Sequence, residues 1–228
     1  WQAANVQRMR RHWLHTTAVP SDLVDATTRA ATATETIWRT AHPESDFKSV
    51  LPSFAELLEL VRDGAAAKAA ALKVSAYEAL MDLYEPGATT AAIDGLFDDY
   101  AAFLPEFLEE VLCVQALRPA PELPNGPFPV EKQEALCRQL SEVVGFDFAS
   151  GRLDTTFHPF SGGVPEDSRI TTRYDEADFT SAMMAVLHET GHAMYERGRP
   201  GSWRYQPVGE TPGLGMHESQ SLIVEMQA

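Results

Sequence analysis

The chain reads DFTSAMMAVLHETGHAMYERG from Asp178 to Gly198. Asp178 is a favoured residue for capping the first turn of a helix. Behind it, apolar residues recur at helical spacing and form one face: Phe179, Met183, Val186 and Leu187. Gly198 and Pro200 are typical of the end of a helix. This stretch therefore predicts one amphipathic helix that begins after Asp178 and ends near Gly198.

His188 and His192 belong to an HExxH motif on this helix. Residues four apart differ by about 40° around a helix axis and by about 6 Å along it, so both imidazoles can reach one metal ion. Glu189 projects beside that ion, where it can take a proton from a water that the metal activates. The alternative is a buried helix whose histidines hydrogen-bond to their neighbours.

A catalytic zinc ion usually has three protein ligands, so this reading requires another ligand later in the chain. Glu218 lies 26 residues after His192, in the stretch Met216–Gln220 that opens a second predicted helix. A glutamate from a following helix completes the His₂Glu set of thermolysin-like enzymes. Glu210, in a loop rich in proline and glycine, and Glu225, two turns further along the second helix, are weaker alternatives.

The chain before this helix divides into two predicted regions. Residues 1–117 form a helical region, with apolar residues at positions i, i+3, i+4 and i+7, as in Phe54, Leu57, Leu58 and Val61. Five prolines crowd into residues 118–129, which predicts an extended connector, because each proline removes a backbone donor and restricts φ.

Residues 130–228 form the predicted metal-site region. A helix is expected over residues 130–144, ended by Gly145, and a strand over Arg169–Tyr174, where β-branched residues gather. We therefore predict a mainly α fold with a small β element near residues 150–175. The regions are expected to form one continuous domain.

Composition excludes several classes of protein. Lys plus Arg number 18 and Asp plus Glu number 33, and a formal net charge of −15 argues against nucleic acid as a partner. The longest apolar run, Ala182–Leu187, is far shorter than the ~18 residues that span a membrane. Cys113 and Cys137 form no CxxC pair, which favours reduced thiols in a cytoplasmic protein.

Four short motifs follow one another in a fixed order along the chain. They are His158-Pro159-Phe160, Asp167-Ser168-Arg169-Ile170-Thr171, the HExxH motif and His217-Glu218-Ser219-Gln220. In these motifs the chain resembles the carboxypeptidase Taq family of zinc metallocarboxypeptidases, which is marked by HPF, DxRxT, HExxH and HES-Q motifs in that order. The resemblance covers nearly the whole chain. It implies a helical metallopeptidase fold with a deep groove, and often a homodimer.

The chain departs from the family pattern at its ends. Family members carry two further motifs after the HES-Q helix, of the forms (I/V)RxxAD and GxxQDxHW, and neither occurs here. The first residue is Trp1, and Ala228 lies inside an apolar-periodic stretch. We therefore expect a peptidase domain that is incomplete at both ends, with part of the catalytic wall missing.

Other residues of the motifs are candidates for substrate binding. By default His158 is an ordinary loop histidine, and the resemblance places it in the active-site cleft. Asp167 and Arg169 are by default an exposed acid–base pair at a strand edge, but such an edge can also bind an extended peptide by β-augmentation. Arg169 or Arg173 could then hold a C-terminal carboxylate through a bidentate pair. Thr171, in the same DxRxT motif, is a further candidate.

The remaining polar candidates lie around the metal-binding residues. His217, next to Glu218, is expected to support the site or line the cleft rather than to bind the metal. Tyr195 and Tyr205 are both possible donors to an oxyanion, and the sequence does not choose between them.

The leading hypothesis is a zinc-dependent carboxypeptidase that releases C-terminal residues from peptides, with Co²⁺ as a possible substitute for Zn²⁺. His188, His192 and Glu218 would hold the metal, and Glu189 would act as general base. This chain by itself is expected to be weakly active. One alternative is a non-catalytic helical interaction module with a vestigial metal site. Another is a related helical metallo-endopeptidase.

Overall fold

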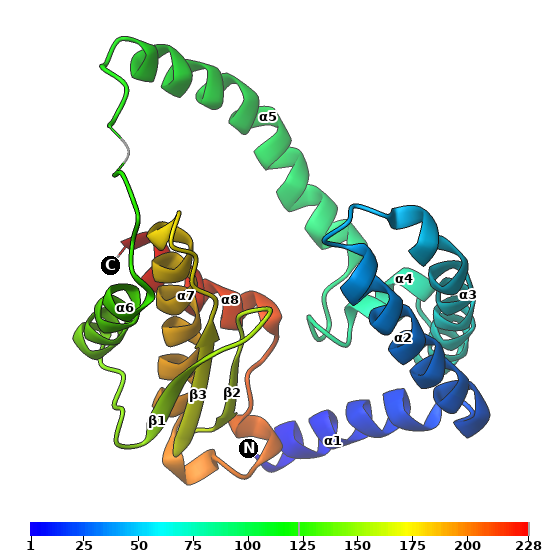
Figure 1. The fold of residues 1–228 in the computed structure, drawn as a ribbon. Helices are drawn as coiled ribbons and strands as arrows, with labels where there is room; N and C mark the ends of the chain where they lie inside the picture. The colour runs from blue at the N-terminus through cyan, green and yellow to red at the C-terminus, as the bar shows by residue number, and fades with distance from the viewer. Residues whose placement is uncertain (123, 228) are drawn as a thin grey trace. The chain divides into compact units, whose positions relative to one another are not determined.

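A computed structural model describes residues 1–122 and 124–227 (Figure 1). The chain divides into two compact units, Trp1–Gly95 and Leu96–Ala228. The first contains α1 (Gln2–Thr17), α2 (Ser21–Ala41), α3 (Phe47–Leu72), α4 (Ala76–Met81) and the start of α5 (Thr90–Ala116). After α5 come α6 (Val130–Val144), β1 (Gly151–Thr155), β2 (Ser161–Val164), β3 (Asp167–Thr172), α7 (Phe179–Gly198), two short 3₁₀ turns (Gly201–Trp203 and Pro207–Gly209) and α8 (Leu214–Gln227). The predicted mainly α fold with a small β element is confirmed.

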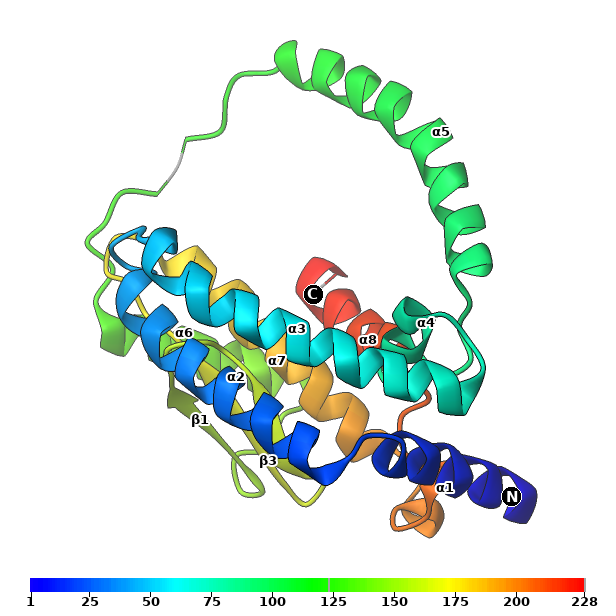
Figure 2. The ribbon, with the colours of Figure 1, turned by 90° about the vertical axis from the view of Figure 1, so that its right-hand side faces the viewer.

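The first unit is built around two long helices that lie side by side, α2 and α3 (Figure 2). Val50 and Ala65 of α3 are buried. Asp82, at the end of α4, ties α1 to this unit, because its carboxylate accepts a hydrogen bond from Arg11 and contacts His15, each at 2.7 Å. Pro20 directly precedes α2, which begins at Ser21.

Helix α5 keeps its apolar residues in solvent. The side chains of Phe97, Phe103 and Phe107 are between 45% and 65% exposed, and no residue of this fully described helix is buried. The periodicity therefore predicted a helix correctly, although the apolar face of this helix is not buried in the structure. The proline-rich connector predicted over residues 118–129 includes residue 123, which lies outside the described residues. Its described residues form neither helix nor strand.

The second unit contains a three-stranded sheet with the order β1-β3-β2. β1 runs parallel to β3 and pairs Leu153 with Ile170, whereas β2 runs antiparallel to β3. The strand predicted over Arg169–Tyr174 is thus present two residues earlier. Its predicted place at a strand edge is wrong, because β3 is hydrogen-bonded on both sides. The backbone groups that β-augmentation would use on β3 are already paired.

Helix α7 lies at the centre of the second unit and packs against the sheet, α6 and α8 (Figure 1). The core joins residues from each of these layers, namely Cys137 of α6, Leu153 of β1, Ile170 of β3, and Ala182, Val186 and Ala193 of α7. The predicted ends of two helices are confirmed. Gly145 ends α6 with φ of 115°, and Asp178 caps α7 by accepting hydrogen bonds from the backbone of Thr180 and Ser181.

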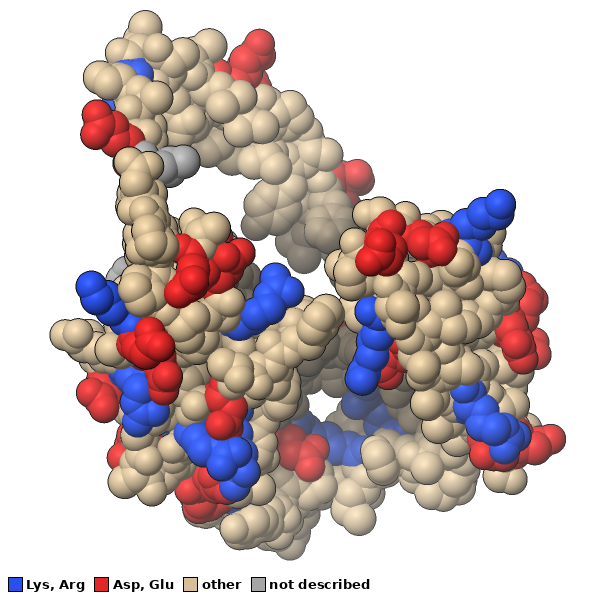
Figure 3. All heavy atoms as spheres, in the orientation of Figure 1, with Lys and Arg blue, Asp and Glu red and all other residues tan. Residues whose placement is uncertain are grey.

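Charged side chains are mixed on the surface of each unit. On the face shown in Figure 3, Lys and Arg lie among Asp and Glu rather than in a continuous basic patch. None of the helices formed by residues 1–122 and 124–227 is long and apolar enough to cross a membrane. Cys113 is exposed and Cys137 is buried, and both are free thiols.

Candidate metal centre

Helices α7 and α8 bring three possible metal ligands together. His188, His192 and Glu218 each offer one ligand atom, and these atoms all lie within 4.8 Å of one another. Oε2 of Glu218 is 3.4 Å from Nε2 of His188 and 3.4 Å from Nε2 of His192. The two imidazoles meet edge to face, as expected for residues one turn apart on the same side of a helix.

This donor set fits a tetrahedral metal ion. Zinc binds imidazole nitrogen and carboxylate oxygen at about 2.0–2.1 Å, and two ligands of a tetrahedron at that distance lie about 3.3–3.4 Å apart. Both nitrogen–oxygen distances to Glu218 have this value. The side chain of Glu218 is half-exposed, so the solvent side of the cluster is open to a water or a substrate.

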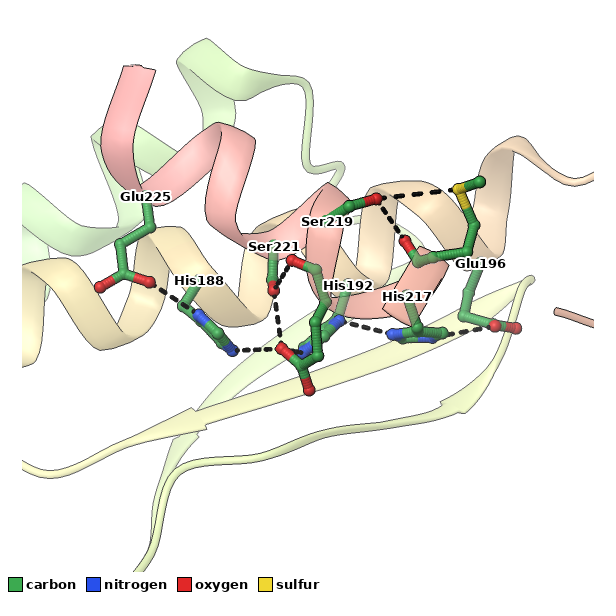
Figure 4. A network of polar contacts seen from close by, with 9 residues as sticks. His188, His192, Glu196, His217, Ser219, Ser221 and Glu225 are labelled. Carbon is green, nitrogen blue, oxygen red and sulfur yellow. Dashed lines mark hydrogen bonds and ion pairs between the residues drawn. The ribbon is translucent and has the colours of Figure 1, made fainter. Parts of the chain in front are cut away.

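The other ring nitrogen of each histidine also has a partner. Nδ1 of His188 lies 2.8 Å from Oε2 of Glu225, and Nδ1 of His192 lies 2.5 Å from Nδ1 of His217. Nε2 of His217 is in turn 3.1 Å from Oε1 of Glu196. Figure 4 shows the result, a continuous chain of polar contacts that runs from Glu225 at one end to Glu196 at the other.

The two outer acidic residues, Glu225 and Glu196, were not predicted in their observed roles. Glu225 was an alternative metal ligand, yet it contacts the outer nitrogen of His188. Glu196 was not singled out at all. Both are separated from a candidate ligand by whole turns of helix, since Glu225 follows Glu218 by seven residues and Glu196 follows His192 by four. That spacing is the signal in the sequence that could have found them.

Burial shifts the pKa of two ionisable groups of the HExxH motif, Glu189 and His192. Burial raises the pKa of Glu189 to about 6, against the opposing attraction of His188 and with a further rise from the Glu218 carboxylate. Burial also lowers the pKa of His192. An imidazole held neutral is the form that binds a metal ion, because its nitrogen lone pair is then free.

Gly191 allows α7 and α8 to approach this closely. A Cβ atom at this position would lie 2.6 Å from Cα of Ser221 and 2.7 Å from the carbonyl oxygen of Gln220. Both atoms belong to the backbone of α8 and cannot rotate away. The hydroxyl of Ser221 also donates a hydrogen bond to Oε2 of Glu218 at 3.0 Å. The close crossing therefore brings Glu218 to α7, and a hydrogen bond within α8 holds its carboxylate.

The HPF and DxRxT segments are joined through Thr171. Its hydroxyl is buried and accepts a hydrogen bond from the backbone N–H of Phe160 at 2.8 Å, and another from the hydroxyl of Thr156 at 2.9 Å. Thr156 contacts the carbonyl oxygen of His158 in an alternative hydrogen bond of 2.7 Å. In this structure Thr171 therefore serves to hold the HPF loop in place.

The charged residues of the DxRxT strand remain accessible. Arg169 donates to Asp167 at 2.8 Å, and about half of each side chain is exposed. This pairing lowers the pKa of Asp167 through the hydrogen bond from Arg169. His158 and Arg173 are also exposed. All four residues can thus be reached from solvent.

The remaining candidates lie elsewhere in the second unit. Glu210 lies outside the cluster of three ligands, in a pocket between α7, α8 and the loop that joins them, on a different face of α7 from the histidines. The hydroxyl of Tyr195 contacts Thr211 at 3.4 Å, and its ring meets that of His217 edge to face. Tyr205 is 87% exposed.

The fold and this cluster together define a mainly helical chain whose HExxH helix meets a glutamate of the following helix. The chain belongs to the carboxypeptidase Taq (M32) metallopeptidase family, whose sequence pattern matches residues 1–228. The family resemblance read from the four motifs is thereby confirmed.

Individual relatives agree with this assignment. The chain is 34% identical to thermostable carboxypeptidase 1 of Thermus thermophilus over 227 residues, which is 96% of this chain and 44% of the relative. Among solved structures, metallocarboxypeptidase 1 of Trypanosoma cruzi superposes with a TM-score of 0.89 at 44% identity, over 99% of this chain and 46% of that one. A carboxypeptidase of Pyrococcus furiosus superposes with a TM-score of 0.86 at 26% identity, over 98% of this chain and 45% of that one. The chain thus spans less than half the length of these relatives.

Proposed function

We propose that this chain supplies the zinc site and the general base of a metallocarboxypeptidase, which releases C-terminal amino acids from peptides. The observation that carries the proposal is the spacing of the donor atoms, with Glu218 3.4 Å from the Nε2 atoms of both His188 and His192. Two imidazoles and one carboxylate are a donor set typical of catalytic zinc. The relatives, which are named carboxypeptidases, support the same activity.

In this proposal His188, His192 and Glu218 would hold Zn²⁺, with Co²⁺ as a substitute. When bound, the ion supplies Lewis acidity to a water and to the scissile carbonyl group. Glu189 accepts the proton of the attacking water and returns it to the leaving amine. Its raised pKa, about 6, suits this exchange near neutral pH, because a base works best when its pKa lies close to the working pH.

The substrate would be a peptide with a free C-terminus. Arg169 and Arg173 are exposed, so either guanidinium could receive the terminal carboxylate, Arg169 by giving up its pairing with Asp167. His158 would line the cleft on the HPF loop that Thr171 holds. The two free cysteines favour a reducing compartment, and we include a cytoplasmic location in the proposal.

The test is Glu189→Gln in a protein of the relatives' full length. Gln is isosteric with Glu and leaves the three proposed ligands in place, so bound zinc should stay at one ion per chain. The rate of cleavage of a blocked dipeptide should fall by about 10²–10⁴-fold, the usual contribution of a general base. Wild-type activity in this variant, or loss of zinc with it, would contradict the assignment of Glu189.

A second comparison separates exopeptidase from endopeptidase action. The same peptide is supplied with a free or an amidated C-terminus. A carboxypeptidase cleaves only the free form, whereas cleavage of both at similar rates would indicate an endopeptidase. A protein that binds zinc but cleaves neither would favour the non-catalytic interaction module.

This chain on its own is expected to be at most weakly active. The proposed zinc ligands lie within it, but by family pattern other motifs of the catalytic wall follow in longer members. The loss of a single oxyanion donor typically lowers the rate by 10²–10³-fold. Activity with excess Zn²⁺ is measured for this chain and for the full-length protein, and equal turnover would show that the further motifs are dispensable.

A further inference from the structure

We propose that Glu225 and the pair His217–Glu196 are positioning residues, which hold the two histidines of α7 in the orientation and tautomer that a metal ion requires. The inference rests on the proposed zinc site and adds to it the residues that prepare it. It is carried by the contacts of the outer ring nitrogens, which Figure 4 shows on either side of the ligand cluster.

The contact with Glu225 determines which ring nitrogen of His188 carries the proton. Its Nε2 faces Glu218, so that nitrogen must carry the lone pair if a metal is to bind there. The ring proton of the neutral imidazole then sits on Nδ1 and is donated to Oε2 of Glu225 at 2.8 Å. Because a carboxylate can only accept, Glu225 selects this tautomer over the other one.

The second contact works through another histidine. With Nε2 of His192 facing Glu218, its proton is on Nδ1 and is donated to Nδ1 of His217 at 2.5 Å. His217 must accept there, which leaves its own proton on Nε2, 3.1 Å from Oε1 of Glu196. Because Glu196 accepts from Nε2 of His217, His217 must accept from His192, and the donor of each of these hydrogen bonds is thereby determined.

Arg199 holds Glu196, the residue at the outer end of the contacts that run from His192 through His217. Its guanidinium pairs with Oε2 of Glu196 at 2.5 Å and donates to the carbonyl oxygen of Gly209 at 2.8 Å. The side chain of Arg199 is 15% exposed and that of Glu196 is 29% exposed, so the ion pair is partly shielded from solvent. The other oxygen of Glu196, Oε1, is thus left to face Nε2 of His217.

The two histidines are therefore supported in different ways. His188 has a direct carboxylate acceptor from α8, whereas His192 reaches its carboxylate through a neutral imidazole, which also comes from α8. Outer hydrogen-bond partners of metal-binding histidines fix ring orientation and raise basicity, and their loss typically lowers metal affinity by about 10–100-fold. Both α8 residues should thus act on metal binding without contacting the metal.

The experiment measures Co²⁺ affinity by competition with a chelator, in this chain and in paired variants. Glu225→Leu and His217→Leu remove the acceptor, and each should weaken binding by about 10–100-fold. Glu225→Gln and His217→Asn keep an acceptor atom near the original position and should recover most of that affinity. Glu142→Leu, at an exposed glutamate of α6, is the matched control and should bind Co²⁺ as the wild type does.

The tautomers are measured directly on the unaltered chain, with ¹⁵N-labelled histidine and long-range proton–nitrogen correlation spectra. Both His188 and His192 should carry the proton on Nδ1, and His217 on Nε2, before and after Zn²⁺ is added. This measurement does not depend on whether a variant folds. A purely structural role for Glu225 or His217 would leave the tautomers of their partners unchanged in the Gln, Asn and Leu variants.

The outcomes distinguish the two proposals. If the wild-type chain binds Co²⁺ and the Leu variants bind it equally well, the positioning roles are overturned and the zinc site stands. If the metal-free chain shows His188 or His192 with the proton on Nε2, the positioning roles are likewise overturned. If the wild-type chain binds neither Co²⁺ nor Zn²⁺, the proposed zinc site fails, and the positioning roles fail with it.

Discussion

Replacing Gly191 by Ala should damage the metal site without touching a proposed ligand. The added Cβ would lie 2.6 Å from Cα of Ser221, whereas ordinary van der Waals contact begins at 3.4 Å. The backbones of α7 and α8 would therefore have to separate by about 0.8 Å (3.4 minus 2.6 Å). Ligand distances in metal sites are held within about 0.2 Å, so this displacement of Glu218 exceeds the tolerance.

Two quantities should change together. The separation of Glu218 from the histidines should weaken Co²⁺ binding by at least about tenfold, the size of effect seen when a metal-binding residue loses its support. Overpacking should lower the free energy of unfolding by about 1–3 kcal/mol, partly offset by the helix propensity of Ala, which exceeds that of Gly by about 1 kcal/mol. The assays are a Co²⁺ titration against a chelator and thermal unfolding followed by circular dichroism.

Gly198→Ala is the matched control, because it makes the same change in the same helix. A Cβ at Gly198 has nothing within 4 Å. This variant should bind Co²⁺ as the wild type does and should be no less stable. If Gly191→Ala behaves like Gly198→Ala in both assays, the close crossing at Gly191 is not what places Glu218, and the reasoning is refuted.

Four further outcomes are expected. Glu218→Ala should weaken Zn²⁺ binding far more than Glu210→Ala, because only Glu218 lies 3.4 Å from both histidines; an equal loss, measured by chelator competition, would place the third ligand elsewhere. Ile170→Ala should cost about 2–5 kcal/mol of unfolding free energy in urea, since this core side chain is fully buried, and a change of under about 1 kcal/mol would contradict its place in the core. At pH 8 a thiol reagent should label Cys113 and spare Cys137, whose pKa burial raises to about 11. Because the folded chain keeps the Cys137 proton that the unfolded chain releases from about pH 9 upward, stability should fall between pH 9 and 11, and less steeply in Cys137→Ala.

Local features of the sequence were sufficient to predict several helices and their ends. Asp178 caps α7 and Gly145 ends α6, because each of these residues acts on the few backbone groups beside it. The pairing of His188 and His192 on one face was equally local, since it follows from helix geometry alone. The need for a third zinc ligand pointed to Glu218, 26 residues after His192, with Glu210 and Glu225 as alternatives.

What the sequence by itself determined was thus the mainly helical class, the ends of two helices and the chemistry of the donor set. Only the tertiary structure decided how distant segments meet. It placed β3 between two other strands, where a local pattern had suggested an edge, because strand order depends on pairing partners that periodicity does not specify. It showed that Glu225 contacts the outer nitrogen of His188 instead of joining the three candidate ligands. It also showed that His217 contacts the outer nitrogen of His192 and is itself in contact with Glu196. These contacts depend on the crossing of α7 and α8 at Gly191, and a crossing distance is set by backbone packing that no single stretch of sequence contains.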